Sequence, residues 1–263
     1  MKWGASTYFL QERPVTDALA VIARLGYSTA EIWMEHYGSA HQRSSTILRQ
    51  TRSLGLELTI HAPSYDVNMI STNAGIRRES LKQIRSSIEL AASLEAKGVV
   101  IHPGSLSSPR GNRSSAWGCL EETVSLLDEW ASGYGLWVGI ENMEKGAKEI
   151  FTLPQDMARL FERHWRTIRL TLDLAHMQTH MDPLSFLRQV RPGWICHVHL
   201  SDNNPTSTHL PLGRGQLPVV DLLKTLRTFY DGIVSLEGYV PGEGEKLLQH
   251  NMDYLRTHGF AIT

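Results

Sequence analysis

The feature that most constrains this sequence is an alternation, repeated eight times, of short β-prone runs with longer amphipathic or polar segments. The expected strands cover Lys2–Thr7, Thr29–Trp33, Leu56–His61, Gly98–His102, Leu136–Glu141, Ile168–Asp173, Ile195–Leu200 and Ile233–Glu237. The expected helices follow them at about 14–25, 40–54, 76–95, 114–133, 154–164, 182–190, 218–229 and 243–258. Strands that alternate with helices pair in parallel, so this order predicts an α/β fold.

Eight such units favour a closed barrel over an open sheet. No linker or composition break separates the units, and the sequence contains neither a GxGxxG string nor a P-loop, which open nucleotide-binding sheets often carry. The 263 residues match the roughly 250 residues of a complete (β/α)8 barrel. We therefore predict a (β/α)8 TIM barrel that forms one domain over residues 1–263.

Composition and charge narrow the classes of function. Hydrophobic residues make up 41% and charged residues 20% of the chain, and the net charge of -1 gives no global electrostatic reason to expect nucleic acid. Cys119 and Cys196 lie far apart, which indicates neither a disulfide framework nor a thiolate zinc site. No signal-peptide pattern and no apolar run of membrane-spanning length occur. We expect a cytoplasmic protein without a membrane partner, and a homo-oligomer is compatible with the sequence.

Six consecutive expected strands, the third to the eighth, end in residues that can bind a metal or move a proton: His61, His102, Glu141, Asp173, His199 and Glu237. The carboxyl ends of barrel strands converge on one mouth. Any one of these residues alone is more simply a loop-edge residue, but six in succession indicate a site. Three carboxylates gathered there would repel one another and lose hydration, and a bound cation removes that cost. The sequence therefore predicts a divalent metal.

The identity of that metal is left open by the residue types. Carboxylate and imidazole ligands without thiolates suit zinc, manganese, magnesium, cobalt or iron. Asp173 and His176 are three residues apart, so both side chains would meet at one place if a helical turn begins there. For His176 alone, a helix cap or an outer partner of the site is an equal alternative.

The string HVH places His197 and His199 on the same face of their expected strand, because strand side chains alternate with a period of two. They cannot both lie at the rim of the mouth. We predict that His197 is a buried structural histidine one layer deeper. Glu31, near the end of the second expected strand, is predicted to form a salt bridge.

Two long polar loops, 102–115 and 201–216, follow expected strands and are predicted to be functional. The second contains His209 and Arg214. Arg214, in a GRG turn, could bind a phosphate or hydroxyl group, with a surface role as the alternative. Trp33 and Tyr65 could form an aromatic wall for a substrate, although isolated aromatic residues more often belong to the core.

Seven strings together carry a family resemblance: HAPSYDVN (61–68), IHPGS (101–105), GIENM (139–143), LTLDLAH (170–176), HVHLSDN (197–203), HLPLGRGQL (209–217) and SLEGY (235–239). Through them the chain resembles the xylose isomerase-like TIM-barrel superfamily over nearly its whole length. That superfamily contains isomerases and epimerases of sugars and sugar phosphates, together with abasic-site nucleases of the endonuclease IV type.

For the epimerase type, the resemblance implies one metal bound by Glu141, Asp173, His199 and Glu237. The metal would polarise the carbonyl of a ketose and stabilise an enediolate, while Glu141 and Glu237 move the proton on the adjacent carbon. The expected substrate is a small carbohydrate-like molecule: a sugar, a sugar phosphate or a related polyol ketone.

For the nuclease type, the resemblance implies three zinc ions. The extra ligands would be His61 and His102 for one ion and His176 and His209 for another. Ser207 stands where the nucleases have an aspartate, and the first strand lacks their histidine-containing string. We therefore favour an isomerase or epimerase. The alternatives are a phosphodiesterase that acts on abasic DNA and a barrel that binds metal without catalysis.

Overall fold

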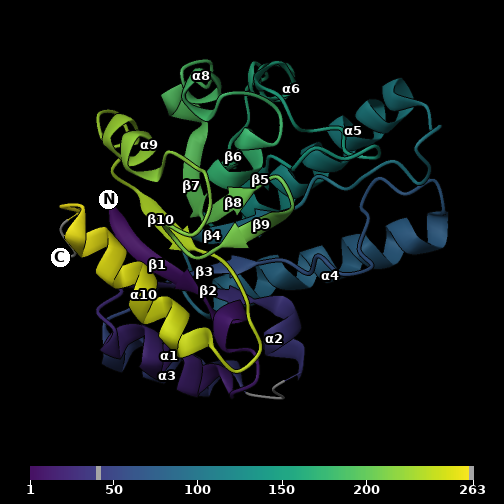
Figure 1. The fold of residues 1–263 in the computed structure, drawn as a ribbon. Coiled ribbons are helices and arrows are strands. Elements are labelled where there is room, and N and C mark those ends of the chain that lie inside the picture. The colour runs from purple at the N-terminus through teal and green to yellow at the C-terminus, as the bar shows by residue number, and fades with distance from the viewer. Residues whose placement is uncertain (40–42, 261–263) are drawn as a thin grey trace.

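The computed structural model describes residues 1–39 and 43–260. Within them, eight parallel strands close into a barrel in the order β1-β10-β7-β6-β5-β4-β3-β2, surrounded by helices (Figure 1). The ring closes because β1 pairs with β10 as well as with β2. The strands are β1 (Lys2–Ser6), β2 (Thr29–Trp33), β3 (Glu57–His61), β4 (Gly98–Ile101), β5 (Trp137–Glu141), β6 (Ile168–Asp173), β7 (Ile195–Leu200) and β10 (Ile233–Leu236). The predicted (β/α)8 barrel is confirmed.

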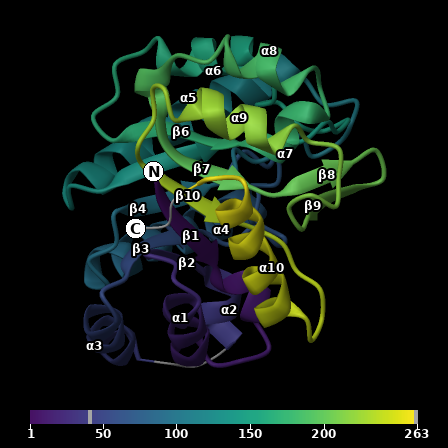
Figure 2. The ribbon, with the colours of Figure 1, turned by 60° about the vertical axis from the view of Figure 1, so that its left-hand side comes forward.

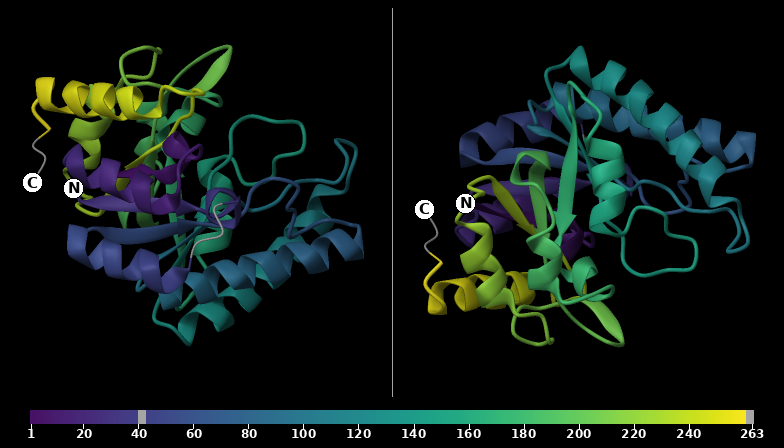
Figure 3. Two further views of the ribbon diagram at one scale, coloured as in Figure 1. Left: turned by 90° about the horizontal axis from the view of Figure 1, so that it is seen from below. Right: turned by 90° about the horizontal axis from the view of Figure 1, so that it is seen from above.

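Eight helices correspond to those expected from the sequence, and apart from the start of α3 their ends lie within three residues of the expected ones: α1 (Val15–Arg24), α3 (Ser44–Leu54), α4 (Ala74–Ser93), α5 (Arg113–Ser132), α6 (Pro154–Phe161), α8 (Pro183–Leu187), α9 (Val219–Leu226) and α10 (Gly244–Thr257). The helix expected at 40–54 is observed from Ser44, and residues 40–42 lie outside the described residues. α4 and α5 run side by side along one flank (Figure 3). None of the helices in the described part of the chain is both long and apolar enough to cross a bilayer.

Short elements outside the expected strands and helices build much of the barrel mouth. They follow the carboxyl ends of β1, β2, β6 and β7, and a further 3-10 turn, η2 (Pro192–Trp194), precedes β7. β8 and β9 form an antiparallel hairpin that projects from the barrel beside α7 (Figure 2). The elements at the mouth are η1 (Thr7–Leu10), α2 (Met34–Ser39), α7 (Leu174–Gln178), β8 (Asp202–Asn204) and β9 (Ser207–Leu210).

The barrel interior is tightly packed and partly polar. A Cβ atom at Gly139 on β5 would lie 2.1 Å from Oγ1 of Thr171 on β6, so only glycine fits there. Glu31, Thr59 and His197 are fully buried inside the barrel. Apolar side chains fill the space between strands and helices. The polar interior of the barrel leads toward the mouth.

Asp128 ties helix α5 to the turn before β6. Its carboxylate accepts hydrogen bonds from the backbone N–H and hydroxyl of Thr167, both at 2.7 Å, and from the backbone N–H of Arg166 at 3.3 Å. Burial alone would raise the pKa of Asp128, but these donors hold it below its ordinary value. The ionised form is therefore favoured in the folded state.

Asp128→Asn is expected to lower the free energy of unfolding at pH 7 by about 1–3 kcal/mol, because the amide nitrogen faces donors that need an acceptor. The pKa of Asp128 is lower in the folded than in the unfolded state. The carboxylate's contribution is therefore complete above the unfolded value of about 3.9 and disappears as the pH falls through the folded value. Urea unfolding of both proteins at several pH values measures this, and a difference that does not shrink in acid contradicts it.

Candidate metal centre

Four buried groups from four neighbouring strands meet at the carboxyl end of the barrel. Glu141 and Asp173 end β5 and β6, His199 lies on β7, and Glu237 directly follows β10. Each offers one ligand atom, and these atoms all lie within 4.8 Å of one another. Nδ1 of His199 is 3.2 Å from Oε1 of Glu141 and 3.3 Å from Oε1 of Glu237. The parallel register explains the meeting, because it pairs Asp173 with His199 across β6 and β7.

The donor set fits a divalent cation. One oxygen of each carboxylate, Oε2 of Glu141, Oδ2 of Asp173 and Oε1 of Glu237, is buried without a hydrogen bond. Carboxylate oxygens in this condition are costly in a protein interior unless a positive charge compensates them. Three carboxylates and an imidazole, without a thiolate, are ligands that suit Zn²⁺, Mn²⁺, Mg²⁺, Co²⁺ or Fe²⁺. The cluster could therefore hold a metal ion, and its geometry does not choose among these ions.

The electrostatic environment separates the two glutamates. Burial raises the pKa of Glu237 to about 8, with Glu141 and Glu31 adding to the shift and His199 opposing it. Burial would also raise the pKa of Glu141, but the imidazole of His199 and contacts from His102 hold it well below its usual value. The pKa of His199 is well above its ordinary value because the surrounding carboxylates outweigh its burial.

His61 and His102 flank Glu141 on one side of the centre. Their Nε2 atoms lie 3.5 and 3.3 Å from Oε2 of Glu141, and the three residues form a second group that could hold an ion. His61 is buried and stacks on Trp33 with ring centroids 4.3 Å apart, whereas the side chain of His102 is 30% exposed. Burial would lower the pKa of His61, but Glu141 and Glu31 raise it to about 9.

His176 and His209 flank Asp173 on the other side and form a third such group with it. The helical turn that the LDLAH string suggested is α7, and Asp173 caps it by accepting the backbone N–H of His176 at 2.7 Å. His209 has a φ of 58°, an uncommon conformation for a residue other than glycine. Its ring centroid is 5.2 Å from that of His176.

Asp202 fixes the loop that carries His209. The carboxylate is 1% exposed and accepts the backbone N–H groups of Gly213, Gly215 and Leu217, each at 2.9 Å. A Cβ atom at Gly215 would lie 2.3 Å from this carboxylate, so the loop closes around it. The buried carboxylate of Asp202 therefore fixes the part of the 201–216 loop around the GRG turn through hydrogen bonds to its backbone.

The remaining predicted residues fall into different positions. Arg214 is exposed and does not belong to the cluster, so its binding role stays a prediction. Trp33 is 9% exposed, and Tyr65 is 56% exposed at the rim. They are joined by Tyr8, which stacks on Trp33 at 4.5 Å and whose hydroxyl lies 2.8 Å from that of Tyr65. Trp33 is therefore buried, the alternative to a wall, while Tyr8, which sequence reasoning missed, links it to the exposed Tyr65. A role of these rings toward a substrate stays a prediction.

Asn142 is a second residue that sequence reasoning missed. It is fully buried, its side chain accepts the backbone N–H of Asp173 at 2.8 Å and donates to the carbonyl of Asp173 at 3.1 Å. Its own carbonyl accepts the Nδ1–H of His176 at 2.8 Å. Asn142 therefore joins the ends of β5 and β6. The sequence signal that could have identified Asn142 is its position directly after Glu141 at a strand end.

The two deeper residues behave as predicted. His197 is buried below the rim, which confirms the structural position predicted for it, and its Nε2 atom lies 2.9 Å from Oε2 of Glu31. Burial lowers the pKa of His197, so the neutral ring is favoured at this contact. Glu31 has a second contact, however, because its Oε1 atom lies 3.1 Å from Nε2 of His199. Glu31, His197 and His199 form a fourth group of possible ligands.

The fold and the cluster define a (β/α)8 barrel with a candidate metal centre at its carboxyl-terminal mouth. The family model described as "Xylose isomerase-like TIM barrel" matches residues 19–258. The chain belongs to this family, which confirms the resemblance that the seven sequence strings carry.

Known proteins are similar over almost the entire chain. The protein MJ1311 of Methanocaldococcus jannaschii is 28% identical over 246 residues, which cover 90% of this chain and 83% of the relative. Fructoselysine 3-epimerase of Shigella flexneri is 24% identical over 259 residues, with 90% of each chain covered. The crystal structure of a D-tagatose 3-epimerase-like protein superposes with a TM-score of 0.87 at 26% identity, covering 98% of this chain and 97% of that one.

Proposed function

We propose that the protein is a divalent-metal-dependent epimerase or isomerase of a sugar, a sugar phosphate or a related polyol ketone. The observation that carries this proposal is the buried cluster of Glu141, Asp173, His199 and Glu237, in which two glutamates stand beside one imidazole. The similarity to fructoselysine 3-epimerase and to the D-tagatose 3-epimerase-like protein supports the sugar as substrate.

In the proposed reaction, the ion and the two glutamates have different roles. A divalent ion held by the four groups supplies a Lewis acid that polarises the substrate carbonyl and stabilises the enediolate. One glutamate accepts the proton from the carbon beside the carbonyl, and the other returns a proton to the opposite face of that carbon. Glu141 and Glu237 are suited to these roles by position, because an Oε1 atom of each lies 3.2 and 3.3 Å from the same nitrogen of His199, so that two carboxylates stand at one site.

The surroundings of the cluster suit this reaction. The four groups are at most 6% exposed, so the substrate carbon would meet the glutamates with little competing water. Near them, the rings of Tyr8 and Tyr65 are partly and largely exposed and offer surfaces against which the C–H face of a sugar can pack, while the buried ring of Trp33 supports Tyr8 from behind. The mouth therefore combines an ionic centre with an apolar wall.

Metal removal tests this proposal. We expect the purified protein to hold one tightly bound divalent ion per chain. A chelator should lower turnover more than about a hundredfold, because carbonyl polarisation by an ion is worth several kcal/mol. Elemental analysis gives the metal content, and readdition of single ions to the stripped protein identifies the active one.

The substrate is found by incubating a panel of ketoses and ketose phosphates with the metal-loaded protein in D2O. Epimerisation through an enediolate places solvent deuterium on the carbon beside the carbonyl, which NMR detects. A protein that binds metal, exchanges no hydrogen in any member of the panel and cleaves abasic duplex DNA would overturn the proposal. If the purified protein binds no divalent ion, the proposal is overturned as well.

A second candidate function is an abasic-site DNA phosphodiesterase, and the two flanking groups favour it. His61 and His102 share Glu141 with the central cluster, and His176 and His209 share Asp173 with it, so three ions could lie side by side. Ser207, which stands in the place of a nuclease aspartate, is exposed on β9. Three ions per chain together with DNA cleavage would favour this function over the first.

A further inference from the structure

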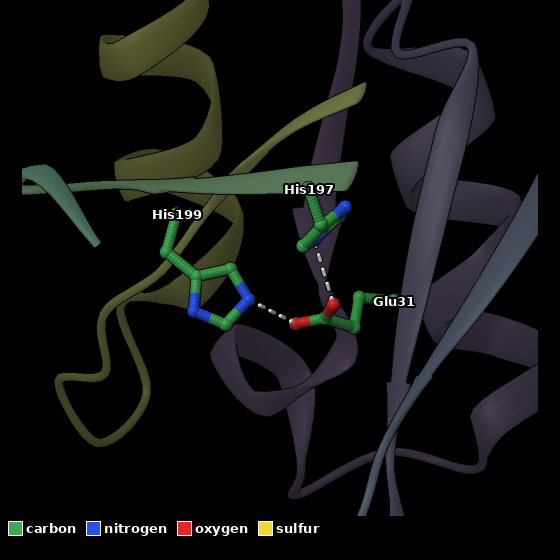
Figure 4. A group of neighbouring side chains, drawn as sticks. All are labelled: Glu31, His197 and His199. Atoms are coloured by element: carbon green, nitrogen blue, oxygen red, sulfur yellow. Dashed lines mark ion pairs between the residues drawn. The ribbon is translucent and has the colours of Figure 1, made fainter. Parts of the chain in front are cut away.

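Glu31 lies below the candidate metal centre and touches His199 from the side opposite the other carboxylates. Figure 4 shows its two carboxylate oxygens directed at the two histidines of β7. Oε1 of Glu31 is 3.1 Å from Nε2 of His199, while Nδ1 of the same ring lies 3.2 Å from Oε1 of Glu141. The imidazole of His199 therefore bridges two layers of the barrel, with one nitrogen facing each.

The contact with Glu31 decides which nitrogen of His199 can bind an ion. A carboxylate oxygen 3.1 Å from a ring nitrogen is attractive only when that nitrogen carries a proton. By the same rule Nδ1, which hydrogen-bonds to Oε1 of Glu141 at 3.2 Å, carries a proton while no cation is bound. A cation among Glu141, Asp173 and Glu237 takes the place of that proton, and the neutral imidazole then keeps its proton at Nε2, the atom that faces Glu31. The opposite tautomer would turn a lone pair toward Glu31 and a proton toward the centre.

Glu31 is itself held in place from below. Its Oε2 atom accepts the hydroxyl of Thr59 on β3 at 3.1 Å and lies 2.9 Å from Nε2 of His197. The ring of His197 stacks against Trp137, with centroids 5.5 Å apart. All three residues, Glu31, Thr59 and His197, are 0% exposed. Thr59 and His197 therefore hold one oxygen of the carboxylate, and the other oxygen faces His199.

The same contacts argue against a separate ion among Glu31, His197 and His199. This group contains one carboxylate and two imidazoles, and each imidazole already faces one oxygen of that carboxylate. The central cluster differs, because it gathers three carboxylates around one imidazole. Of these two groups, the central cluster is the one with an excess of negative charge that calls for a cation.

We propose that Glu31 is a positioning residue, which holds the proton of His199 at Nε2 and so presents Nδ1 to the metal. His197 and Thr59 serve as its anchors. This inference rests on the proposed function, because it requires that the central cluster binds an ion. Although Glu31 is not a ligand of the ion, the affinity of the central cluster for the ion should depend on it.

The first test is the affinity for Zn²⁺ of the metal-free protein, measured by competition with a chromophoric chelator. Glu31→Gln keeps the size of the side chain but presents an amide, and we expect the dissociation constant to rise about 10–100-fold. Glu35→Gln is the matched control. Glu35 is four residues further on, and its carboxylate accepts the backbone N–H groups of Ser64 and Tyr65 at 2.6 and 2.9 Å, outside the cluster. We expect its constant to stay within about threefold of wild type.

Unchanged affinity in Glu31→Gln would overturn the inference. So would a wild-type protein that binds two ions tightly, of which Glu31→Gln loses only one, because that result would make the deeper group a metal site. A wild-type protein that binds no divalent ion would overturn the proposed function, and this inference with it. The three outcomes are told apart by the number of bound ions and their affinities.

A second measurement on the wild type does not depend on the folding of a variant. With ¹⁵N-labelled histidine and bound Zn²⁺, long-range ¹H–¹⁵N spectra assign the proton and the metal to particular ring nitrogens. We expect His199 to carry its proton at Nε2 and the metal at Nδ1. The reverse assignment would overturn the inference, whatever the affinities.

Discussion

Glu237→Gln is expected to lower turnover about a thousandfold or more while the barrel stays folded. The amide has the size of the carboxyl group, but it neither accepts nor returns a proton, and general acid or base catalysis by one residue is worth about 10²–10⁴-fold. The loss of one charge from a buried cluster of three carboxylates is tolerable for folding. The measurement is kcat on the sugar that the panel identifies, with the metal content determined on the same sample.

The control is a second substitution of glutamate by glutamine, at a position away from the candidate metal centre. Glu243→Gln removes a partly exposed carboxylate that pairs with Lys246 near the start of α10, and it should leave turnover within about twofold of wild type. In Glu237→Gln, Glu141 is still able to exchange the carbon-bound hydrogen of one epimer with D2O. We therefore expect exchange in only one of the two epimers. A variant with bound metal and more than a tenth of wild-type turnover would exclude Glu237 as an acid/base group.

The barrel and the meeting of the four groups could be predicted from the sequence for a topological reason. Once eight strands run parallel in a closed ring, every strand end reaches the same mouth, so residues such as Glu141 and Asp173 must approach each other without further information. Strand ends were predicted within one residue because buried strands differ sharply from the polar loops that follow. Their assignment as metal ligands and catalytic groups stays a prediction.

Other parts of the mouth could not be predicted because they depend on tertiary contacts. Helix α7 is five residues long, and its start depends on the capping by Asp173. The sequence showed that Glu31 is a candidate for a salt bridge, yet only the register of β2, β3 and the closed ring brings it under His199 as well as His197. Short elements and second contacts of this kind leave no periodic signal in a sequence.

Asp202→Asn is expected to lower the free energy of unfolding by about 2–6 kcal/mol, because two buried N–H donors lose their acceptor at a cost of about 1–3 kcal/mol each. Oδ2 of Asp202 accepts the backbone N–H groups of Gly213 and Gly215, and Oδ1 accepts those of Asn203 and Leu217. An amide has one oxygen only. Its nitrogen must therefore face two N–H donors, whichever way the side chain is turned.

Urea unfolding measures this cost, with Asp231→Asn as the control. Asp231 is an exposed aspartate just before β10, and its substitution should change stability by less than about 0.5 kcal/mol. Limited proteolysis of folded Asp202→Asn should cut first within 203–216, where the released backbone becomes accessible. A stability within about 1 kcal/mol of wild type would show that the loop does not depend on the buried charge.

The same variant separates the loop from the candidate metal centre. His209 lies on the loop that Asp202 holds, whereas Glu141, Asp173 and His199 lie on barrel strands and Glu237 directly follows one. Asp202→Asn should therefore keep the affinity of the central ion within a fewfold of wild type and raise KM for the sugar. If the loop instead supplies an essential ligand through His209, metal affinity must fall together with stability. That result would favour the multinuclear site and hence the nuclease over the epimerase.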